Sequence, residues 1–264
     1  MTLWPLHDKT ILDASTFEWT YYWRRRSLRA ATVLAALPVL LTLVVAGVKM
    51  LDSEWIHIDR RGVDILPWLF AIFYLRLLMF VLPFISSTTL ISREAESGAL
   101  PFLLVRPLSR HALLLGKFVG SWWTLCALCC GSYLVTTIVL VAADGFADSR
   151  EILLATPAYL ITLCVGTLAH AAFFTLVGLV ARRPAFVGLV AILWENLIGY
   201  LPGLIRNFTI RFHLTAFIPD LGVPSAWLGT TERAPLLDAL GWLILGTAGA
   251  LAISAFVFGR RDYT

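Results

Sequence analysis

The sequence predicts an all-α integral membrane protein, and three observations lead to that fold class. Hydrophobic residues make up 59% of the 264 residues and charged residues only 14%, whereas soluble proteins carry about 25% charged residues. The hydrophobic residues form continuous runs long enough to cross a bilayer as helices, which takes about 20 residues each. A helix satisfies its own backbone hydrogen bonds in lipid, and the runs lack the alternation of a transmembrane β-strand. One membrane domain is therefore predicted over residues 1–264.

Residues 1–27 precede the first long apolar run, and we expect them to include a helix lying in the cytoplasmic interface of the membrane. Ser15 and Glu18 have the spacing of a capping box, which starts a helix. Aromatic residues follow, and the segment then reaches the basic cluster at residues 24–26, a composition typical of an interfacial helix. The alternative is an irregular aromatic segment that leads into the first span.

Six apolar runs are predicted to be transmembrane helices. They occupy, in order, residues 28–51, 65–91, 118–143, 152–181, 185–201 and 239–258. The fourth and fifth are separated only by Arg182, Arg183 and Pro184, a polar turn in which the proline cannot continue a helix. If the N-terminus is cytoplasmic, 13 of the 21 Lys and Arg residues lie inside, 7 lie outside and 1 lies within a span. The positive-inside rule therefore predicts that both termini are cytoplasmic.

The segment between the last two spans, residues 202–238, is predicted to form short half-helices that dip into the outer leaflet. It is moderately apolar, but Pro219, Pro224 and Pro235 interrupt it and prevent one continuous helix. Non-helical backbone survives at membrane depth only where protein covers it or where it lines a wet cavity. A re-entrant structure therefore fits this pattern better than a free loop.

Two charged side chains lie deep within the predicted spans. Arg76 is 11 residues into the second span, and Glu195 is 10 residues past the start of the fifth. At 1.5 Å per residue both lie about 15 Å deep, near the midplane. A charge at that depth is costly unless it is paired or hydrated, so we expect Arg76 and Glu195 to form an ion pair. The pair either fixes helix packing or takes part directly in the passage of a substrate.

Three cysteines, Cys126, Cys129 and Cys130, share one face of the third predicted span, because residues three and four apart are neighbours on a helix. Soft thiolates in such an arrangement can bind copper(I). The alternative is that these cysteines pack as small apolar residues. The sequence favours packing, because the one other cysteine, Cys164, stands alone in the next span.

No catalytic motif is found in the sequence, so we expect that the chain is not itself an enzyme and binds no cofactor. Gly116 and Lys117 resemble the end of a P-loop, but His111 stands where the first glycine is needed and Phe118 where a serine or threonine is needed. Any ATP hydrolysis is therefore expected from another chain. The basic residues stand at the ends of apolar runs, so we expect the lipid bilayer as a partner and no nucleic acid.

Residues 92–117, between the second and third predicted spans, resemble the signature of type-2, exporter-type ABC transporter permeases. In that family an acidic helix is followed by a glycine, an apolar stretch, a Pro–apolar–Ser/Thr–Arg turn and a Gly-Lys pair that opens the next helix. The matching residues are, in order, Glu94, Gly98, Pro107, Ser109, Arg110, Gly116 and Lys117. The ending at residues 258–263 is similar to the basic, aspartate-containing tail of these chains, and the predicted topology extends the resemblance over the whole sequence.

The resemblance implies a permease subunit that forms a homodimer in the bacterial cytoplasmic membrane. Two copies of a separately encoded ATP-binding subunit would bind ATP and magnesium, and the dimer contact would lie near the first and fifth spans. Residues 92–117 would contain a coupling helix whose charges fix its register in a groove of the ATPase while apolar side chains fill that groove. The expected coupling residues are Glu94, Glu96, Gly98, Leu100, Phe102, Leu103, Leu104, Arg106, Pro107 and Arg110.

We further expect residues 202–238 to close the outer end of the transport path, with Phe217, Pro219 and Pro224 at an outer gate. The lack of a large outer domain or a charged cavity favours an amphipathic or apolar substrate. The alternative function is a secondary transporter driven by an ion gradient, in which Arg76 and Glu195 are the coupling charges. An ATP-binding subunit encoded beside this chain would decide for the ABC permease.

Overall fold

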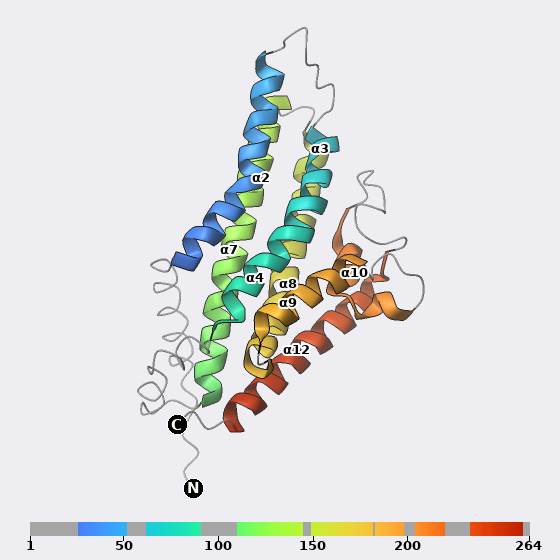
Figure 1. Ribbon diagram of the computed structural model, residues 1–264. Coiled ribbons are helices and arrows are strands. Elements are labelled where there is room, and N and C mark those ends of the chain that lie inside the picture. The colour runs from blue at the N-terminus through green and yellow to red at the C-terminus, as the bar shows by residue number, and fades with distance from the viewer. Residues whose placement is uncertain are drawn as a thin grey trace.

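The computed structural model describes residues 26–51, 62–90, 110–144, 149–181, 183–197, 204–219 and 233–260. Every secondary-structure element in these ranges is a helix, and no strand occurs in them. Figure 1 shows several of the long helices running side by side, with the C-terminal helix inclined across the lower part of the molecule. Five segments of the described chain are long and apolar enough to cross a membrane: Arg29–Lys49, Gly62–Ser87, Arg110–Asp144, Arg150–Val180 and Leu236–Arg260. The predicted all-helical membrane class is thereby confirmed.

The fifth predicted span corresponds to the short helix α9 (Pro184–Leu197). Its 14 residues extend about 21 Å at 1.5 Å per residue, which is less than the hydrocarbon core of about 30 Å. Residues 198–201, which complete the predicted span, lie outside the described residues. The six-span topology and the cytoplasmic position of both termini therefore stay predictions.

Helix α7 (Arg110–Asp144) begins eight residues before the predicted third span. Residues 110–117 include alanine and three leucines, which favour helix, although their charged neighbours lower the hydropathy of the stretch. The end of the predicted coupling segment is thus continuous with a long helix. Most of that segment, residues 91–109, lies outside the described residues, as does the predicted interfacial helix in residues 1–25.

The second predicted span is one helical segment that changes its winding twice. It consists of α3 (Gly62–Leu69), the π-helix η1 (Phe70–Leu78) and α4 (Met79–Ser87). At the end of η1 the Met79 N–H donates to the Tyr74 carbonyl, five residues back. Wide π turns are rare and are frequently found at functional sites. The turn carries Arg76, so the charged residue of this span lies where the helix departs from regular α geometry.

Helix α8 (Arg150–Val180) lies at the centre of the bundle, packed against α4, α7 and α12 (Leu236–Arg260). Helix α2 (Arg26–Leu51) packs along α7. The interior contains a cluster of aromatic side chains from η1, α7 and α8, with ring centroids 4.4–5.9 Å apart. Its members are Phe70, Tyr74, Tyr133 and Tyr159. Burial of these large rings holds the helices together where they cross.

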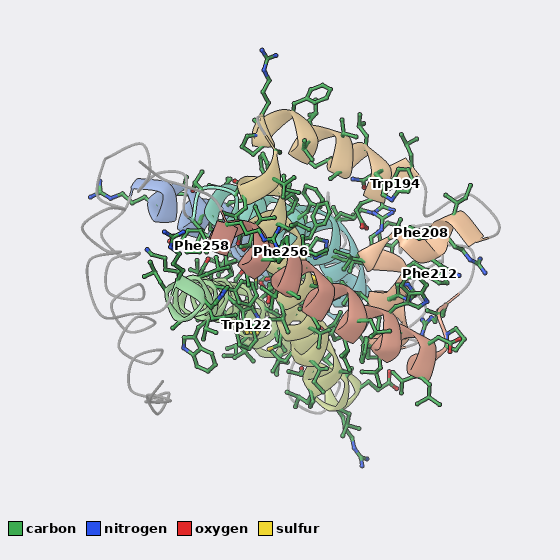
Figure 2. All side chains as sticks on the ribbon, turned by 90° about the horizontal axis from the view of Figure 1, so that it is seen from below. Trp122, Trp194, Phe208, Phe212, Phe256 and Phe258 are labelled. Carbon is green, nitrogen blue, oxygen red and sulfur yellow. The ribbon has the colours of Figure 1, made fainter. Side chains whose placement is uncertain are left out.

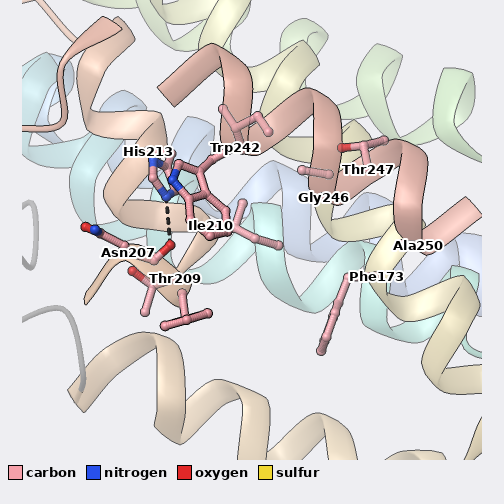
Figure 3. Close-up of a pocket in the computed structure, with 12 residues that line it drawn as sticks. Phe173, Asn207, Thr209, Ile210, His213, Trp242, Gly246, Thr247 and Ala250 are labelled. Carbon is pink, nitrogen blue, oxygen red and sulfur yellow. Dashed lines mark hydrogen bonds between the residues drawn. The ribbon is translucent and has the colours of Figure 1, made fainter. Parts of the chain in front are cut away.

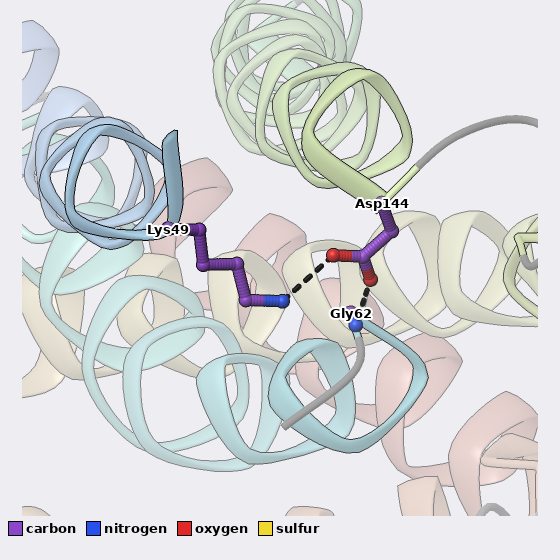
Figure 4. Close-up of polar contacts among 3 residues, drawn as sticks. All are labelled: Lys49, Gly62 and Asp144. Carbon is purple, nitrogen blue, oxygen red and sulfur yellow. Dashed lines mark hydrogen bonds and ion pairs between the residues drawn. The ribbon is translucent and has the colours of Figure 1, made fainter. Parts of the chain in front are cut away.

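A polar clamp joins three helix ends at the upper end of the molecule in Figure 1. The Lys49 ammonium at the end of α2 lies 2.7 Å from one carboxylate oxygen of Asp144 at the end of α7. The other oxygen of Asp144 accepts a hydrogen bond from the Gly62 N–H, which starts α3 (Figure 4). A carboxylate is favourable at a helix start because the first N–H groups there lack partners within the helix. One aspartate therefore fixes the relative positions of three helices.

Candidate functional site

A chain of short helices precedes α12, and the candidate site is built around it. Its elements are η3 (Leu204–Phe208), α10 (Ile210–Leu214) and η4 (Thr215–Phe217). Each has at most five residues, so none can cross a membrane. α10 packs against α8 and α12, and its side chains are buried from Arg211 to Leu214. The predicted short half-helices occur here, and their depth in the outer leaflet stays a prediction.

Glu195, near the end of α9, holds the start of α10. One oxygen of its carboxylate accepts a hydrogen bond from the Ile210 N–H at 2.8 Å, and the other accepts one from the Arg211 N–H at 3.1 Å. Thr209, the residue at the N-cap of α10, makes no capping hydrogen bond with its side chain. A carboxylate at a helix start satisfies unpaired N–H groups and is favoured by the helix dipole. Glu195 thus caps α10 from a different helix, although only 8% of its surface is exposed.

Further polar contacts fasten the same segment to its neighbours. The buried Arg211 guanidinium donates from Nη1 to the Asn196 side-chain carbonyl at 3.1 Å, which adds a second link to α9. Nε2 of His213 donates to the Asn207 carbonyl at 2.8 Å, and its ring stacks on Trp242 of α12. The segment is therefore held by hydrogen bonds to α9 on one side and by ring stacking on α12 on the other.

An apolar cavity of about 630 Å³ lies beside this polar cluster, between α4, α8, α9 and η3. Its ionisable lining residues are Glu195 and His170, and aromatic and aliphatic side chains form most of the wall. In Figure 2 α9 lies at the edge of the bundle, and its Trp194 lies close to Phe208 of η3; both residues line this cavity. A cavity of this size falls in the range of binding sites for small molecules, about 300–1,000 Å³.

A second cavity of about 200 Å³ lies on the other side of the short helices, against α12. Figure 3 shows the His213–Asn207 hydrogen bond at its edge, with Trp242 and Gly246 on the α12 side. The two cavities share Phe173, Phe208 and Ile210. These three side chains therefore form a partition between the two spaces.

The structure describes the surroundings of both residues of the predicted ion pair, Glu195 and Arg76. Glu195 is bound by backbone N–H groups, as described above. Arg76 is half-buried within η1. The two backbone N–H groups stabilise the carboxylate charge of Glu195 where it is buried. An ion pair between Arg76 and Glu195 stays a prediction.

The structure describes two of the three predicted gate residues. Phe217 is the last residue of η4 and packs, half-buried, against a cluster that includes Phe212 and Ala239. Pro219 is half-buried just beyond it, and Pro224 lies outside the described residues. The two described gate residues thus stand at the end of the short helices, and their role in gating stays a prediction.

Of the predicted coupling residues, Arg110 alone is described. Its Nη1 donates to the Gly259 carbonyl at 3.1 Å, so the start of α7 is bonded to the last turn of α12. The last carbonyls of a helix lack partners within it, which makes them natural acceptors for arginine. The other predicted coupling residues lie outside the described residues: Glu94, Glu96, Gly98, Leu100, Phe102, Leu103, Leu104, Arg106 and Pro107.

Sequence reasoning did not identify Asn196, Arg211, His213 or Trp242 as members of the site. One signal was available, because Arg211 and His213 stand two residues apart in an otherwise apolar stretch. Charged or polar side chains in such a stretch mark a buried polar contact. Asn196 and Trp242 carry no comparable signal, since their role depends on which neighbour the fold places beside them.

The long apolar helices define the class of the protein, a helical integral membrane protein, and its short helices line an apolar cavity. The model of the ABC-2 family transporter proteins matches residues 31–263, and the chain belongs to this family. It is therefore a multi-pass membrane protein and a permease component of an ABC transporter, a kind of subunit that associates with an ABC ATP-binding subunit. No curated protein matches the chain.

Proposed function

We propose that this chain is the permease half of an ATP-driven exporter that moves an amphipathic or apolar molecule across the bacterial cytoplasmic membrane. Two copies would form the path, and two separate ATP-binding subunits would drive it. The observation that carries the proposal is the 630 Å³ cavity. It lies against α9 and against the short helices, which are hydrogen-bonded to Glu195 and Asn196 of α9.

The character of the cavity wall supports the substrate class. Its lining is almost entirely aromatic and aliphatic, which favours burial of apolar surface. Glu195 contributes a carboxylate to the wall, and each of its oxygens accepts a hydrogen bond from a backbone N–H group. An inorganic ion or a sugar would find few unoccupied polar groups there. An apolar or amphipathic molecule has few polar groups that must give up their hydrogen bonds to water when it enters such a site.

The exposed faces of two helices support assembly as a homodimer. On α9 the exposed apolar side chains recur at helical spacing and form one stripe: Phe186, Leu189, Leu193 and Leu197. A similar stripe runs along α2: Val33, Leu37, Leu40 and Val44. These helices correspond to the first and fifth predicted spans. In the proposed dimer the two stripes meet the second copy, so that α9 lies between the partner and the cavity.

The long helix α7 supports the proposed route from the ATPase to the cavity. Residues 92–109 would dock on the ATP-binding subunit, and α7 follows directly at Arg110. Because Arg110 is bonded to the end of α12, movement of the coupling segment would reach α7 and α12 together. α12 contacts α10, so the same movement would reach the short helices, where Phe217, Pro219 and Pro224 would act as the outer gate.

Blocking the cavity tests the proposal. Ala191→Trp would place a large ring in the cavity, whereas Ala142→Trp, at an exposed position of α7 away from the cavity and from the two stripes, leaves it open. The purified complex with the ATP-binding subunit is assayed for stimulation of ATP hydrolysis by a panel of amphipathic dyes and a panel of sugars and amino acids. We expect the dyes to stimulate ATP hydrolysis and the sugars and amino acids not to, and we expect stimulation to fall at least about tenfold in Ala191→Trp but not in Ala142→Trp. Full stimulation of Ala191→Trp, or stimulation by the hydrophilic panel alone, contradicts the proposal.

A further inference from the structure

Away from the cavities, three thiol sulfurs converge where α7 meets α8. Sγ of Cys126 lies 3.2 Å from Sγ of Cys164 and 3.9 Å from Sγ of Cys130. The third separation, between Cys130 and Cys164, is 3.8 Å. None of the three is in a disulfide. The cluster differs from the group that the sequence suggested, because Cys164 takes part and Cys129 does not.

The helices hold these sulfurs in place through their regular geometry. Cys126 and Cys130 are four residues apart on α7 and therefore stack on one face. Cys164 enters from α8, and its backbone carbonyl accepts hydrogen bonds from Trp122 Nε1 at 3.3 Å and from the Thr167 hydroxyl at 3.1 Å. Trp122 stands one turn before Cys126 on α7, so this bond sets the register of α8 against the two cysteines. The convergence follows from packed helices and not from a loop.

The distances between the three sulfurs match those expected when three thiolates bind one metal ion. A metal about 2.3 Å from each of three sulfurs places the sulfurs about 4.0 Å apart in a trigonal plane and about 3.8 Å apart on a tetrahedron. Two of the three observed separations, 3.8 and 3.9 Å, have these values. The third, 3.2 Å, is well beyond the 2.05 Å of a disulfide bond, and a small rotation of one thiol would bring it to the required length.

The donor set selects the metal. Among the described residues the group consists of three cysteines, with no histidine or carboxylate completing it. Zinc prefers four ligands in a tetrahedron, whereas soft thiolates select copper(I), and three sulfurs are a sufficient set for copper(I).

Charge balance is compatible with the same ion. Cys126 is the 17th of the 35 residues of α7, and Cys164 is the 15th of the 31 residues of α8, so the site lies at mid-helix. One Cu⁺ that replaces one thiol proton leaves the net charge unchanged, which matters because charge is costly at membrane depth. A divalent ion must displace two thiol protons to reach the same balance, and zinc would still lack a fourth ligand within this group.

We propose that Cys126, Cys130 and Cys164 form a binding site for one copper(I) ion that joins α7 to α8. The site is separate from the proposed export path, and its test does not depend on transport. Cys129 supplies a matched control, because it lies on the same helix, is fully buried in the apolar core and is not part of the cluster.

The test is an anaerobic titration of the purified full-length chain, in detergent, with copper(I) in competition with a copper(I) chelator. We expect one copper per chain and an X-ray absorption spectrum with three sulfurs at about 2.3 Å. Changing even supporting residues around a metal costs about 10–100-fold in affinity, so each of Cys126→Ala, Cys130→Ala and Cys164→Ala should weaken binding at least about tenfold. Cys129→Ala should bind as the parent does. Thermal unfolding of each variant without copper verifies that it is folded.

The proposal is overturned if the parent chain takes up no more copper than the triple alanine variant. It is also overturned if Cys129→Ala loses as much affinity as the other three single variants. A third overturning result is that the fully reduced chain re-forms a Cys126–Cys164 disulfide, seen as a cross-linked peptide by mass spectrometry, and takes up no copper. A preference for zinc over copper(I) would overturn the identity of the ion.

Discussion

The Glu195 carboxylate occupies the position that a capping side chain usually takes at the start of a helix. Its depth was predictable, because the residue stands inside an apolar run. Its partners were not predictable, because backbone N–H groups carry no sequence signature and Ile210 stands 15 positions further along the chain. The sequence led us to expect a cation, Arg76, as the partner of this carboxylate. The structure shows two backbone amides bound to it, and the contact with Arg76 stays a prediction.

Removing this cap should loosen the short helices. Glu195→Ala leaves two buried N–H groups without their acceptor, and each unsatisfied group costs about 1–3 kcal/mol. We expect a loss of about 2–4 kcal/mol in the free energy of unfolding, measured in mixed detergent micelles. Glu195→Gln keeps one acceptor oxygen and should lose about half as much.

A double-mutant cycle separates the cap from the predicted ion pair. If Glu195 acts only on α10, the losses in Arg76→Gln and Glu195→Gln should add within about 0.5 kcal/mol. A coupling energy above about 1 kcal/mol would identify Arg76 as a partner of the carboxylate. A Glu195→Ala variant as stable as the parent would show that the cap does not hold the segment.

The members of the cysteine cluster could also be predicted only in part, because the sequence does not show which faces of two helices meet. The helical spacing of Cys126 and Cys130 was visible along the chain, and so was the neighbouring span with Cys164. Which face of α8 meets α7 depends on the rotation of both helices, and the spacing alone also admitted Cys129. Contacts between residues 34 and 38 positions apart decided between them.

At the scale of elements, the long helices were predictable because about 20 consecutive apolar residues have few alternatives in lipid. The residues at which the helices begin and end were harder to predict. α7 starts eight residues early because helix propensity continues beyond the point where hydropathy falls. The π-helical winding of η1 has no signature in a search for apolar runs, although Pro67 and Pro83 stand on either side of it.

The coupling segment yields a prediction at this scale. Glu94 and Glu96 are expected to contact the ATP-binding subunit, and losing one partner of a desolvated charge contact costs about 2–5 kcal/mol. The double variant Glu94→Ala, Glu96→Ala should therefore insert and dimerise normally but lose at least about tenfold of its substrate-stimulated ATP hydrolysis. Glu151→Ala is the matched control, since it removes an exposed carboxylate from the first turn of α8.

Two measurements check this prediction, ATP hydrolysis by the reconstituted complex and the mass of the purified permease in detergent. If the double variant binds its ATPase and hydrolyses ATP as the parent does, residues 92–117 are not the coupling element. If Glu151→Ala is equally impaired, the effect comes from general loss of negative charge.

For the whole molecule, the central claim is that ATP hydrolysis on a partner subunit drives passage through this chain. Family membership favours that claim over an ion-gradient carrier, as does the structural role of Glu195, whose carboxylate caps α10 through two backbone N–H groups. A carrier would instead need a carboxylate that releases and takes up an ion during each cycle.

The most direct test is transport of an amphipathic dye by proteoliposomes containing the chain and the ATP-binding subunit encoded beside it. We expect transport with ATP and none with a non-hydrolysable analogue. Transport should also vanish when the P-loop lysine of the ATP-binding subunit is replaced, and it should persist when ionophores collapse all ion gradients. Transport by this chain without the ATP-binding subunit, driven by a proton or sodium gradient and abolished by ionophores, would contradict the account.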